Sequence, residues 1–394
     1  MQQQEIVIVG MARTAMGGFQ GALSGLTAGQ LGAAAIRAAV ERAGVAAGEV
    51  DEVIMGCVLP AGQGQAPARQ AALGGGLPQA TPCTTINKMC GSGMKAVMMA
   101  HDQLLAGNGQ VVVAGGMESM SNAPYLMPKA RGGLRLGHGE IKDHMFLDGL
   151  EDAYQKGTLM GVFAEQCAEK YGFSRQDQDE FAIASLTRAQ QAIKGGQFKD
   201  EIAAVTVPGR GGDTVVDTDE QPLKANLDKI PTLKPAFKKD GTVTPANSSS
   251  ISDGGAALVL MTAAEAAKRS LQPIARIVGH SSYAHEPGWF TTAPVHAIEK
   301  LLAKTGWKAG EVDLYEINEA FAVVTMAAMH DLKLPHDKVN VHGGACALGH
   351  PIGASGARIV ISLLSALKQR GGKRGVASLC IGGGEATALA VELI

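Results

Sequence analysis

The chain has 394 residues, of which 46% are hydrophobic and only 4% aromatic, and its formal net charge is -2. This length predicts two or three domains rather than one, and the near-neutral charge argues against a nucleic-acid partner. No apolar run is long enough to span a bilayer, and the start of the chain lacks the basic region of a signal peptide.

The six cysteines show neither a CxxC motif nor the Cys/His spacing of a zinc site; they stand at positions 57, 83, 90, 167, 346 and 380. We therefore expect free thiols, no bound metal and a reducing, cytoplasmic location.

The first segments alternate between strand and helix patterns. The apolar run Ile6–Val9 predicts a strand that ends at Gly10, and Leu26–Ala43 predicts a helix with Thr27 as its cap. A G-x-x-A-G-E-V-D turn at 44–51 then leads into a second strand.

A cysteine among small residues follows, in the string Asn87-Lys88-Met89-Cys90-Gly91-Ser92-Gly93. Residues 94–100 are apolar nearly all round, which predicts a helix buried in the protein centre. A thiol at the start of a helix faces unpaired N–H groups and the positive end of the helix dipole, so we expect its thiolate to be favoured. Taken alone, an inert buried cysteine is the more frequent explanation of such a residue.

The same order returns in the second half of the chain. The G-x-x-A-G-E-V-D string recurs at 306–313, after a helical stretch at 297–303. A glycine-rich turn at 353–356 opens a helix at 357–367, and a strand follows at 376–384, as the strand at 111–116 follows the Cys90 helix. Matched order and spacing predict an internal duplication of two layered α/β halves.

A region of different character separates the halves. It is rich in charged and turn residues, with helical stretches at 162–170 and 177–194, and its length favours a functional lid or subdomain. We therefore predict a first half at 1–117 plus 245–270, an inserted loop domain at 118–244, and a second half at 271–394.

Three glycine-packed stretches in the second half carry candidate chemistry: 316–321 with Asn318, 342–353 with His350, and 380–384 with Cys380. Alone, each has an ordinary structural explanation: a satisfied histidine, a core cysteine, an amide that bonds a loop. The duplication, however, places Cys90 and His350 at the starts of equivalent helices, and ligands bind where strands such as those before Asn318 and Cys380 end. We expect these four side chains to converge.

The strings Asn87–Gly93, Asn318–Ala322, Gly349–Arg358 and Cys380–Gly384 resemble the signature blocks of the thiolase family, and the resemblance covers essentially the whole chain. It implies duplicated α/β halves in a layered αβαβα arrangement with an inserted loop domain. It also implies acyl transfer between coenzyme A thioesters, without a permanently bound cofactor, by a homodimer or homotetramer. The short-chain members, which interconvert acetyl-CoA and acetoacetyl-CoA, are the most similar; a 3-ketoacyl-CoA thiolase of broader chain length is the alternative.

The resemblance also implies a role for each residue of the site. Cys90 matches the nucleophile that accepts the acyl group, His350 the histidine that activates it, and Cys380 the acid/base that moves a proton on the α-carbon. One oxyanion hole is formed by His350 and a water held by Asn318, and the other by the backbone N–H groups of Cys90 and Gly382. The reaction has a use for two thiols, because one holds the acyl group while the other moves a proton.

Substrate-binding residues follow from the same comparison. Ser249, in a loop that includes Ala246, matches a serine that contacts the pantetheine arm. Lys224 aligns with a basic residue that holds the nucleotide end, and a solvated surface charge is an equally good explanation of it. Met160 and Phe290 match positions in the acyl pocket, and we hypothesise that Phe290 keeps the acyl chain short.

Three other functions are weaker explanations of this sequence. A decarboxylating ketoacyl synthase shares the architecture but uses one cysteine and two histidines, whereas Cys380 stands in the third position here. A non-catalytic acyl-CoA carrier would be expected to lack a nucleophile or base, and a cysteine hydrolase would leave the second thiol idle. Leu159 and His342 replace residues that many short-chain thiolases carry, so the exact acyl chain stays open.

Overall fold

The computed structural model describes residues 4–394, which form a mixed eleven-stranded sheet with helices on both faces. Its main path runs in the order β13-β14-β15-β12-β1-β11-β5-β3-β4. These strands are β1 (Ile6–Thr14), β3 (Glu52–Gly56), β4 (Cys83–Ile86), β5 (Val111–Ser119), β11 (Ser252–Thr262), β12 (Ala275–Ala284), β13 (Leu314–Ile317), β14 (Arg374–Ile381) and β15 (Glu385–Leu393). The short strands are β2 (Gly17–Gly18), β6 (Tyr125–Leu126), β7 (Lys142–Asp143), β8 (Ile202–Ala203), β9 (Val205–Val207) and β10 (Thr214–Val216).

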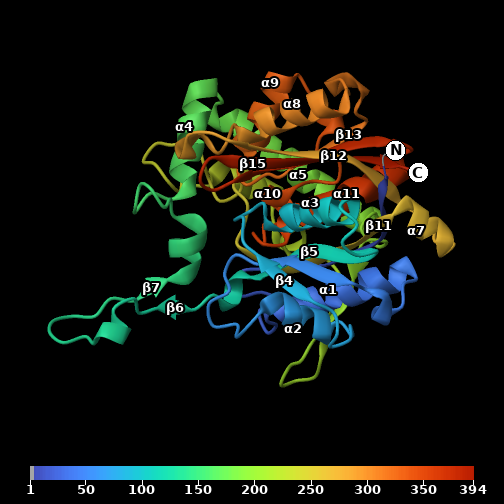
Figure 1. Cartoon of the computed structure of the whole chain (residues 1–394). Coiled ribbons are helices and arrows are strands. Elements are labelled where there is room, and N and C mark those ends of the chain that lie inside the picture. The colour runs from blue at the N-terminus through green and yellow to red at the C-terminus, as the bar shows by residue number, and fades with distance from the viewer. Residues whose placement is uncertain (1–3) are drawn as a thin grey trace.

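The helices complete five layers (Figure 1). Helices α1 and α2 cover one outer face, α8 and α9 cover the other, and α3 and α11 lie between the two halves of the sheet. The helices are α1 (Ala28–Ala43), α2 (Pro67–Gly74), α3 (Ser92–Leu105), α4 (Met160–Tyr171), α5 (Arg175–Gly195), α6 (Glu220–Lys224), α7 (Ala263–Lys268), α8 (Ala293–Thr305), α9 (Ala322–Leu332), α10 (Ala345–Leu348) and α11 (Ser355–Arg370). The predicted αβαβα arrangement is confirmed.

Each half of the sheet repeats the same strand pairing. In the first half β3 pairs parallel with β5, β5 antiparallel with β11, and β11 antiparallel with β1. In the second half β13, β14, β15 and β12 pair in the same order with the same orientations. A short antiparallel contact between β1 and β12, at Val7–Arg276 and Ile8–Ala275, joins the halves into one sheet. The repeated pairing is what an internal duplication produces.

Two glycines let the central helices touch. A Cβ at Gly93 of α3 would lie 2.8 Å from the backbone nitrogen of Ala357, and a Cβ at Gly356 of α11 would lie 2.3 Å from that of Met94. Both distances are shorter than real Cβ contacts, so only glycine fits at this crossing. The crossing brings the starts of α3 and α11 together, and both helices are buried along most of their length.

Some boundaries differ from the sequence prediction. Strand β1 does not end at Gly10 but continues to Thr14, with a register shift between Ile8 and Gly10. A Cβ at Gly10 would lie 2.3 Å from the carbonyl oxygen of Ala39, so this glycine permits close packing against α1 rather than ending the strand. Thr27 caps α1 as predicted, through a capping box with Gln30.

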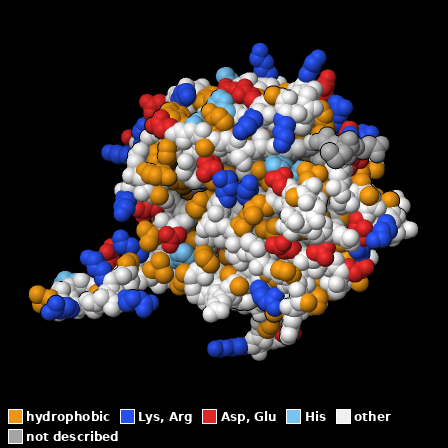
Figure 2. Space-filling view, viewed as in Figure 1, with side chains coloured by type: hydrophobic (Ala, Val, Ile, Leu, Met, Phe, Trp, Pro, Cys, Tyr) orange, Lys and Arg blue, Asp and Glu red, His pale blue; other side chains and the backbone are white. Residues whose placement is uncertain are grey.

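The segment between β5 and β11, residues 120–251, is the long insertion. It contains α4, α5 and α6, and its β6–β7 hairpin belongs to an arm that projects from the body (Figures 1 and 2). In the equivalent place of the second half, β14 and β15 are joined by a turn at 382–384. Across the described part of the chain, helices with the length and apolarity of a membrane span are not found.

Candidate active site

Seven of the predicted site residues line one pocket of about 350 Å³. These are Cys90, Met160, Ser249, Phe290, His350, Cys380 and Gly382. Most of the other lining side chains are apolar, including Met120, Phe146, Leu150, Leu159 and Ile352. An apolar pocket with a few convergent reactive groups is typical of an enzyme site.

Cys90 lies on a tight turn between β4 and α3. Met89, just before it, has a φ of 47°, a left-handed conformation that is uncommon for a residue with a side chain. The Ser92 hydroxyl donates to the Met89 carbonyl oxygen at 2.6 Å and accepts from the Lys88 N–H at 2.8 Å, which fixes the turn. A Cβ at Gly91 would lie 2.4 Å from Ile381 Cδ1, so glycine lets this turn approach β14.

Burial opposes the thiolate that the sequence predicts at Cys90. Burial raises its pKa to about 11, although the backbone N–H groups of Gly382 and of Cys90 itself act in the opposite direction. The cost of removing water from the thiolate therefore exceeds its stabilisation by the N-terminus of α3, which acts only within the first helical turn. Cys90 needs a base.

His350 lines the same pocket and is the candidate for that base. Its Nδ1 lies 2.6 Å from the Ser355 hydroxyl, which itself donates to the Pro351 carbonyl oxygen at 3.0 Å. Because a carbonyl only accepts, the serine proton is directed at Pro351, so Nδ1 carries the ring proton and Nε2 keeps its lone pair. Burial, and then the charge of Arg358, lower the pKa of His350 to about 3, so the imidazole is neutral.

Asn318 lies behind His350 rather than in the pocket lining. It follows β13 directly, and its Nδ2 lies 3.5 Å from His350 Nε2. The buried guanidinium of Arg358 donates to Asn318 Oδ1 at 3.4 Å and lies 3.7 Å from a Glu316 carboxylate oxygen. Arg358 therefore sets which end of the amide faces the imidazole.

Cys380 and Gly382 stand at the end of β14 and in the turn that follows. The Cys380 side chain is buried, and burial and the neighbouring Cys90 raise its pKa well above the ordinary range of a thiol. Cys380 is therefore a neutral thiol with a proton to give. A Cβ at Gly382 would have Met160 Sδ, at 3.9 Å, as its nearest neighbour, so the backbone there is open to the pocket.

Aromatic packing fixes one wall of the pocket. The Phe290 side chain is buried, with its ring centre 6.4 Å from that of Phe163 and 6.4 Å from that of Phe321. The edge-to-face contact with Phe163, at 89°, is a favoured geometry for aromatic pairs. Phe290 is therefore a rigid boundary.

Of the three residues predicted to bind coenzyme A, only Ser249 lines the pocket. Its N–H and hydroxyl both donate to the Ala320 carbonyl oxygen, at 2.9 and 3.0 Å. Ala246 packs instead against the apolar cluster of α5 and α10. The Lys224 side chain is 67% exposed, pairs with Glu220 and does not line the pocket.

Sequence reasoning missed two residues that support the site, Ser355 and Arg358. Both fall inside the Gly349–Arg358 string, whose spacing places them on the first turn of α11, near His350. Their hydrogen bonds depend on the tertiary fold, so the string alone gave no role to either.

Two neutral thiols, a neutral imidazole and backbone N–H groups, converging in an apolar pocket on a duplicated α/β fold, define an enzyme that transfers acyl groups through a cysteine.

The chain belongs to the thiolase family: the model of the thiolase N-terminal domain matches residues 6–264, and that of the C-terminal domain matches residues 271–393. Curated relatives include an acetyl-CoA acetyltransferase of Pseudomonas aeruginosa, 50% identical over 98% of both chains. Acetyl-CoA acetyltransferase 2 of Arabidopsis thaliana is 52% identical over 99% of this chain and 98% of its own. The crystal structure of the Bacillus anthracis acetyl-CoA acetyltransferase superposes with a TM-score of 0.97, at 44% identity, covering 100% of this chain and 99% of that one.

Proposed function

We propose that this protein is an acetyl-CoA C-acetyltransferase, which reversibly condenses two acetyl-CoA molecules to acetoacetyl-CoA and free coenzyme A. The observation that carries the proposal is the presence of two thiols, Cys90 and Cys380, beside the neutral His350 in one apolar pocket. The relatives with this name, at about half identity over the full length, support the choice of substrate.

In the first half-reaction the Cys90 sulfur attacks the thioester carbonyl of acetyl-CoA. His350 Nε2 accepts the thiol proton and returns it to the departing sulfur of coenzyme A, so atoms and charge balance. The backbone N–H groups of Cys90 and Gly382, which already face the sulfur, supply donors for the oxygen that becomes negative.

In the second half-reaction Cys380 first passes its proton to His350 Nε2 and then, as a thiolate, accepts a proton from the methyl carbon of a second acetyl-CoA. The resulting enolate carbon attacks the acetyl group on Cys90, forming the carbon–carbon bond and releasing the Cys90 thiolate. The protonated His350 Nε2, with a water held by Asn318, donates to the enolate oxygen and then returns its proton to the Cys90 thiolate. Coenzyme A thioesters are substrates here, and the scheme requires no permanently bound cofactor.

Thiolysis of acetoacetyl-CoA by free coenzyme A tests the proposal, beside 3-ketooctanoyl-CoA and malonyl-CoA at matched concentrations. Fast cleavage of acetoacetyl-CoA with little cleavage of the longer substrate is the expected result. Preference for 3-ketooctanoyl-CoA would move the protein to the thiolases of broader chain length. Release of carbon dioxide from malonyl-CoA without thiolysis would contradict the role of Cys380.

We further propose a homotetramer assembled through the projecting arm at 122–143. The arm leaves large apolar side chains in solvent: Leu136 is 98% exposed, Tyr125 65% and Ile141 63%. Such exposed apolar side chains favour a protein partner. Sedimentation analysis of the native chain beside Leu136→Glu tests this: the variant is expected to form a smaller oligomer, and an unchanged mass would contradict the proposal. We also propose a cytoplasmic location, in keeping with six free cysteines; fractionation of the source cells would test it.

A further inference from the structure

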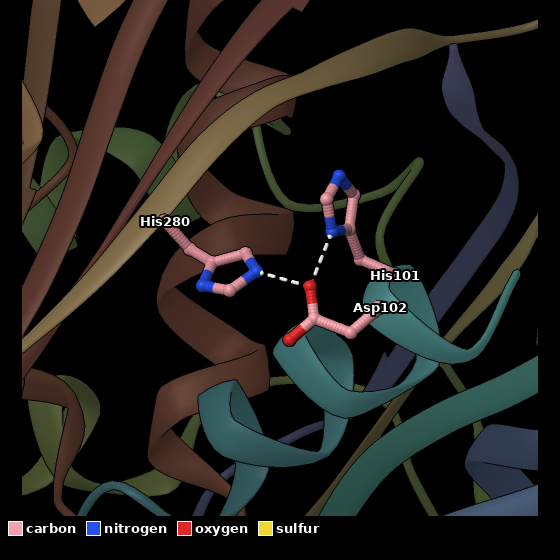
Figure 3. Close-up of side chains that lie close together, drawn as sticks. All are labelled: His101, Asp102 and His280. Atoms are coloured by element: carbon pink, nitrogen blue, oxygen red, sulfur yellow. Dashed lines mark hydrogen bonds and ion pairs between the residues drawn. The ribbon is translucent and has the colours of Figure 1, made fainter. Parts of the chain in front are cut away.

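A second cluster of chemically active side chains lies far from the pocket. His101 and Asp102 belong to α3, and His280 belongs to β12 in the other half of the fold (Figure 3). Asp102 Oδ1 lies 3.0 Å from His101 Nδ1 and 2.8 Å from His280 Nε2, so one carboxylate oxygen faces both imidazoles. The proposed reaction uses none of these groups.

The cluster is separated from the nucleophile by the length of α3. Cys90 precedes the first turn of this helix, and His101 is nine residues beyond Ser92, so about 14 Å of helix lies between them. The two imidazole side chains are 11% exposed, whereas that of Asp102 is 56% exposed. The two imidazoles are therefore buried while the carboxylate is open to solvent, which gives an ion a route to the site.

We propose that His101, Asp102 and His280 form a binding site for a divalent transition-metal ion of the zinc class. Two imidazole nitrogens and a carboxylate oxygen, all within 4.8 Å of one another, are a donor set that such ions prefer. The site rests on this geometry and is independent of the acyl-transfer chemistry.

The distances suit an ion after a small adjustment. Ligand atoms about 2.1 Å from a tetrahedral Zn²⁺ are about 3.4 Å from each other. The carboxylate oxygen lies 2.8 and 3.0 Å from the nitrogens and must move away from them by about half an ångström. The two nitrogens, which lie within 4.8 Å of each other, must reach the same separation of about 3.4 Å. Asp102, the most exposed of the three, has room for this movement, and water from the open side completes the coordination.

The ring nitrogens that do not face the carboxylate also permit binding. The second ring nitrogen of each histidine points away from Asp102 (Figure 3). The proton of a neutral imidazole can therefore move to that nitrogen, leaving the inner one free to bind the metal.

Metal at this site would connect the two halves of the fold, because its ligands come from α3 and β12. Binding to the folded chain alone raises its stability by mass action. Zinc is thus expected to raise the melting temperature without changing the turnover of acetoacetyl-CoA.

Titration calorimetry with Zn²⁺, on protein first treated with a chelator and then desalted, provides the test. We expect about one ion per chain, with binding at least tenfold weaker in His101→Gln and in His280→Gln. His330→Gln is the matched control, since His330 also lies 2.8 Å from the next residue, Asp331, but has no second imidazole on that carboxylate. Equal zinc affinity in the native chain and His280→Gln would overturn the proposal.

A spectroscopic measurement keeps the test decisive if a variant fails to fold. Co²⁺ bound to the native chain through nitrogen and oxygen is expected to give weak visible bands without the strong near-ultraviolet absorption of thiolate ligands. Strong thiolate absorption would assign the ion to cysteines instead, and no cobalt spectrum would mean no site. Either result would overturn the proposal.

Discussion

The hydroxyl of Ser355 decides which nitrogen of His350 can act as a base. It lies 2.6 Å from Nδ1, inside the protein, and its own proton is donated to the Pro351 carbonyl oxygen. In Ser355→Ala the Nδ1 proton loses its acceptor. An unsatisfied buried donor costs about 1–3 kcal/mol, and the ring escapes this cost when the proton moves to Nε2. The base is then blocked.

The magnitude follows from that cost. A shift of about 1–3 kcal/mol in the tautomer equilibrium corresponds to roughly 5- to 140-fold slower acylation, at about 1.4 kcal/mol for each factor of ten. Rapid mixing with acetyl-CoA, followed by quenching and mass measurement of acetylated Cys90, gives the rate directly. Binding of acetyl-CoA should change far less, because Ser355 does not line the pocket.

Ser365→Ala is the matched control. Ser365 is buried on the same helix, and among the described residues its hydroxyl has no hydrogen-bond partner, so its removal should leave the acylation rate unchanged. Acylation of Ser355→Ala at the native rate would refute the argument that this serine sets the tautomer. Equal slowing of both variants would indicate a general disturbance of α11.

Four further changes test other parts of the structure. Cys380→Ser should still acetylate Cys90 but lose condensation by roughly 100-fold or more, as measured by acetoacetyl-CoA formation. Phe290→Ala should raise the ratio of 3-ketooctanoyl-CoA to acetoacetyl-CoA cleavage by about tenfold, because the rigid wall is removed. Gly356→Ala should lower the free energy of unfolding by about 3 kcal/mol, since its Cβ would meet a backbone nitrogen at 2.3 Å. Burial lowers the pKa of His342 to about 4. The free energy of unfolding of the protein should therefore fall by up to about 3 kcal/mol as the pH falls from 6.5 toward 4. In denaturant titrations, His342→Asn should flatten that decline.

Each of these has a control variant or an outcome that would contradict it. Cys90→Ser should form no acetylated cysteine, and an acetylated product there would reassign the nucleophile. An unchanged cleavage ratio in Phe290→Ala would show that another residue limits the chain. Gly310→Ala, with open space around its Cβ, should cost little, so equal losses in both glycine variants would contradict the packing argument. Stability falls toward low pH because the imidazole of the unfolded chain binds a proton below pH 6.5, whereas the buried one binds it only near pH 4. A steeper decline in His342→Asn would contradict this reasoning.

The duplicated architecture and most of the pocket were predictable because they depend on local patterns. The G-x-x-A-G-E-V-D string and the glycine-rich helix starts are repeated in the chain itself, and each string that resembles a thiolase block contributes a residue at or directly behind the pocket. Gly10 shows the limit of such reasoning. A glycine after an apolar run is an ordinary signal for the end of a strand, but here close contact with Ala39 explains it.

Features that depend on burial or on distant contacts were not predictable. The dipole argument for Cys90 was local, whereas the desolvation that raises its pKa comes from the whole pocket. Cys/His spacing also could not show that Asp102 and His280, which are 178 residues apart, lie side by side. Lys224 was equally well explained as a surface charge, and the structure places it at the surface.

The two halves of the fold differ in one equivalent connection between strands. Between β14 and β15 the chain reverses within 382–384, next to the reacting thiols, while between β5 and β11 it makes the long excursion of 120–251 that supplies much of the substrate wall. The turn beside Cys380 and most of the pocket wall are therefore formed by separate, equivalent connections. Evolution, or an engineer, is free to exchange the longer loop for one with a different wall, leaving the nucleophile, the imidazole and the second thiol in place.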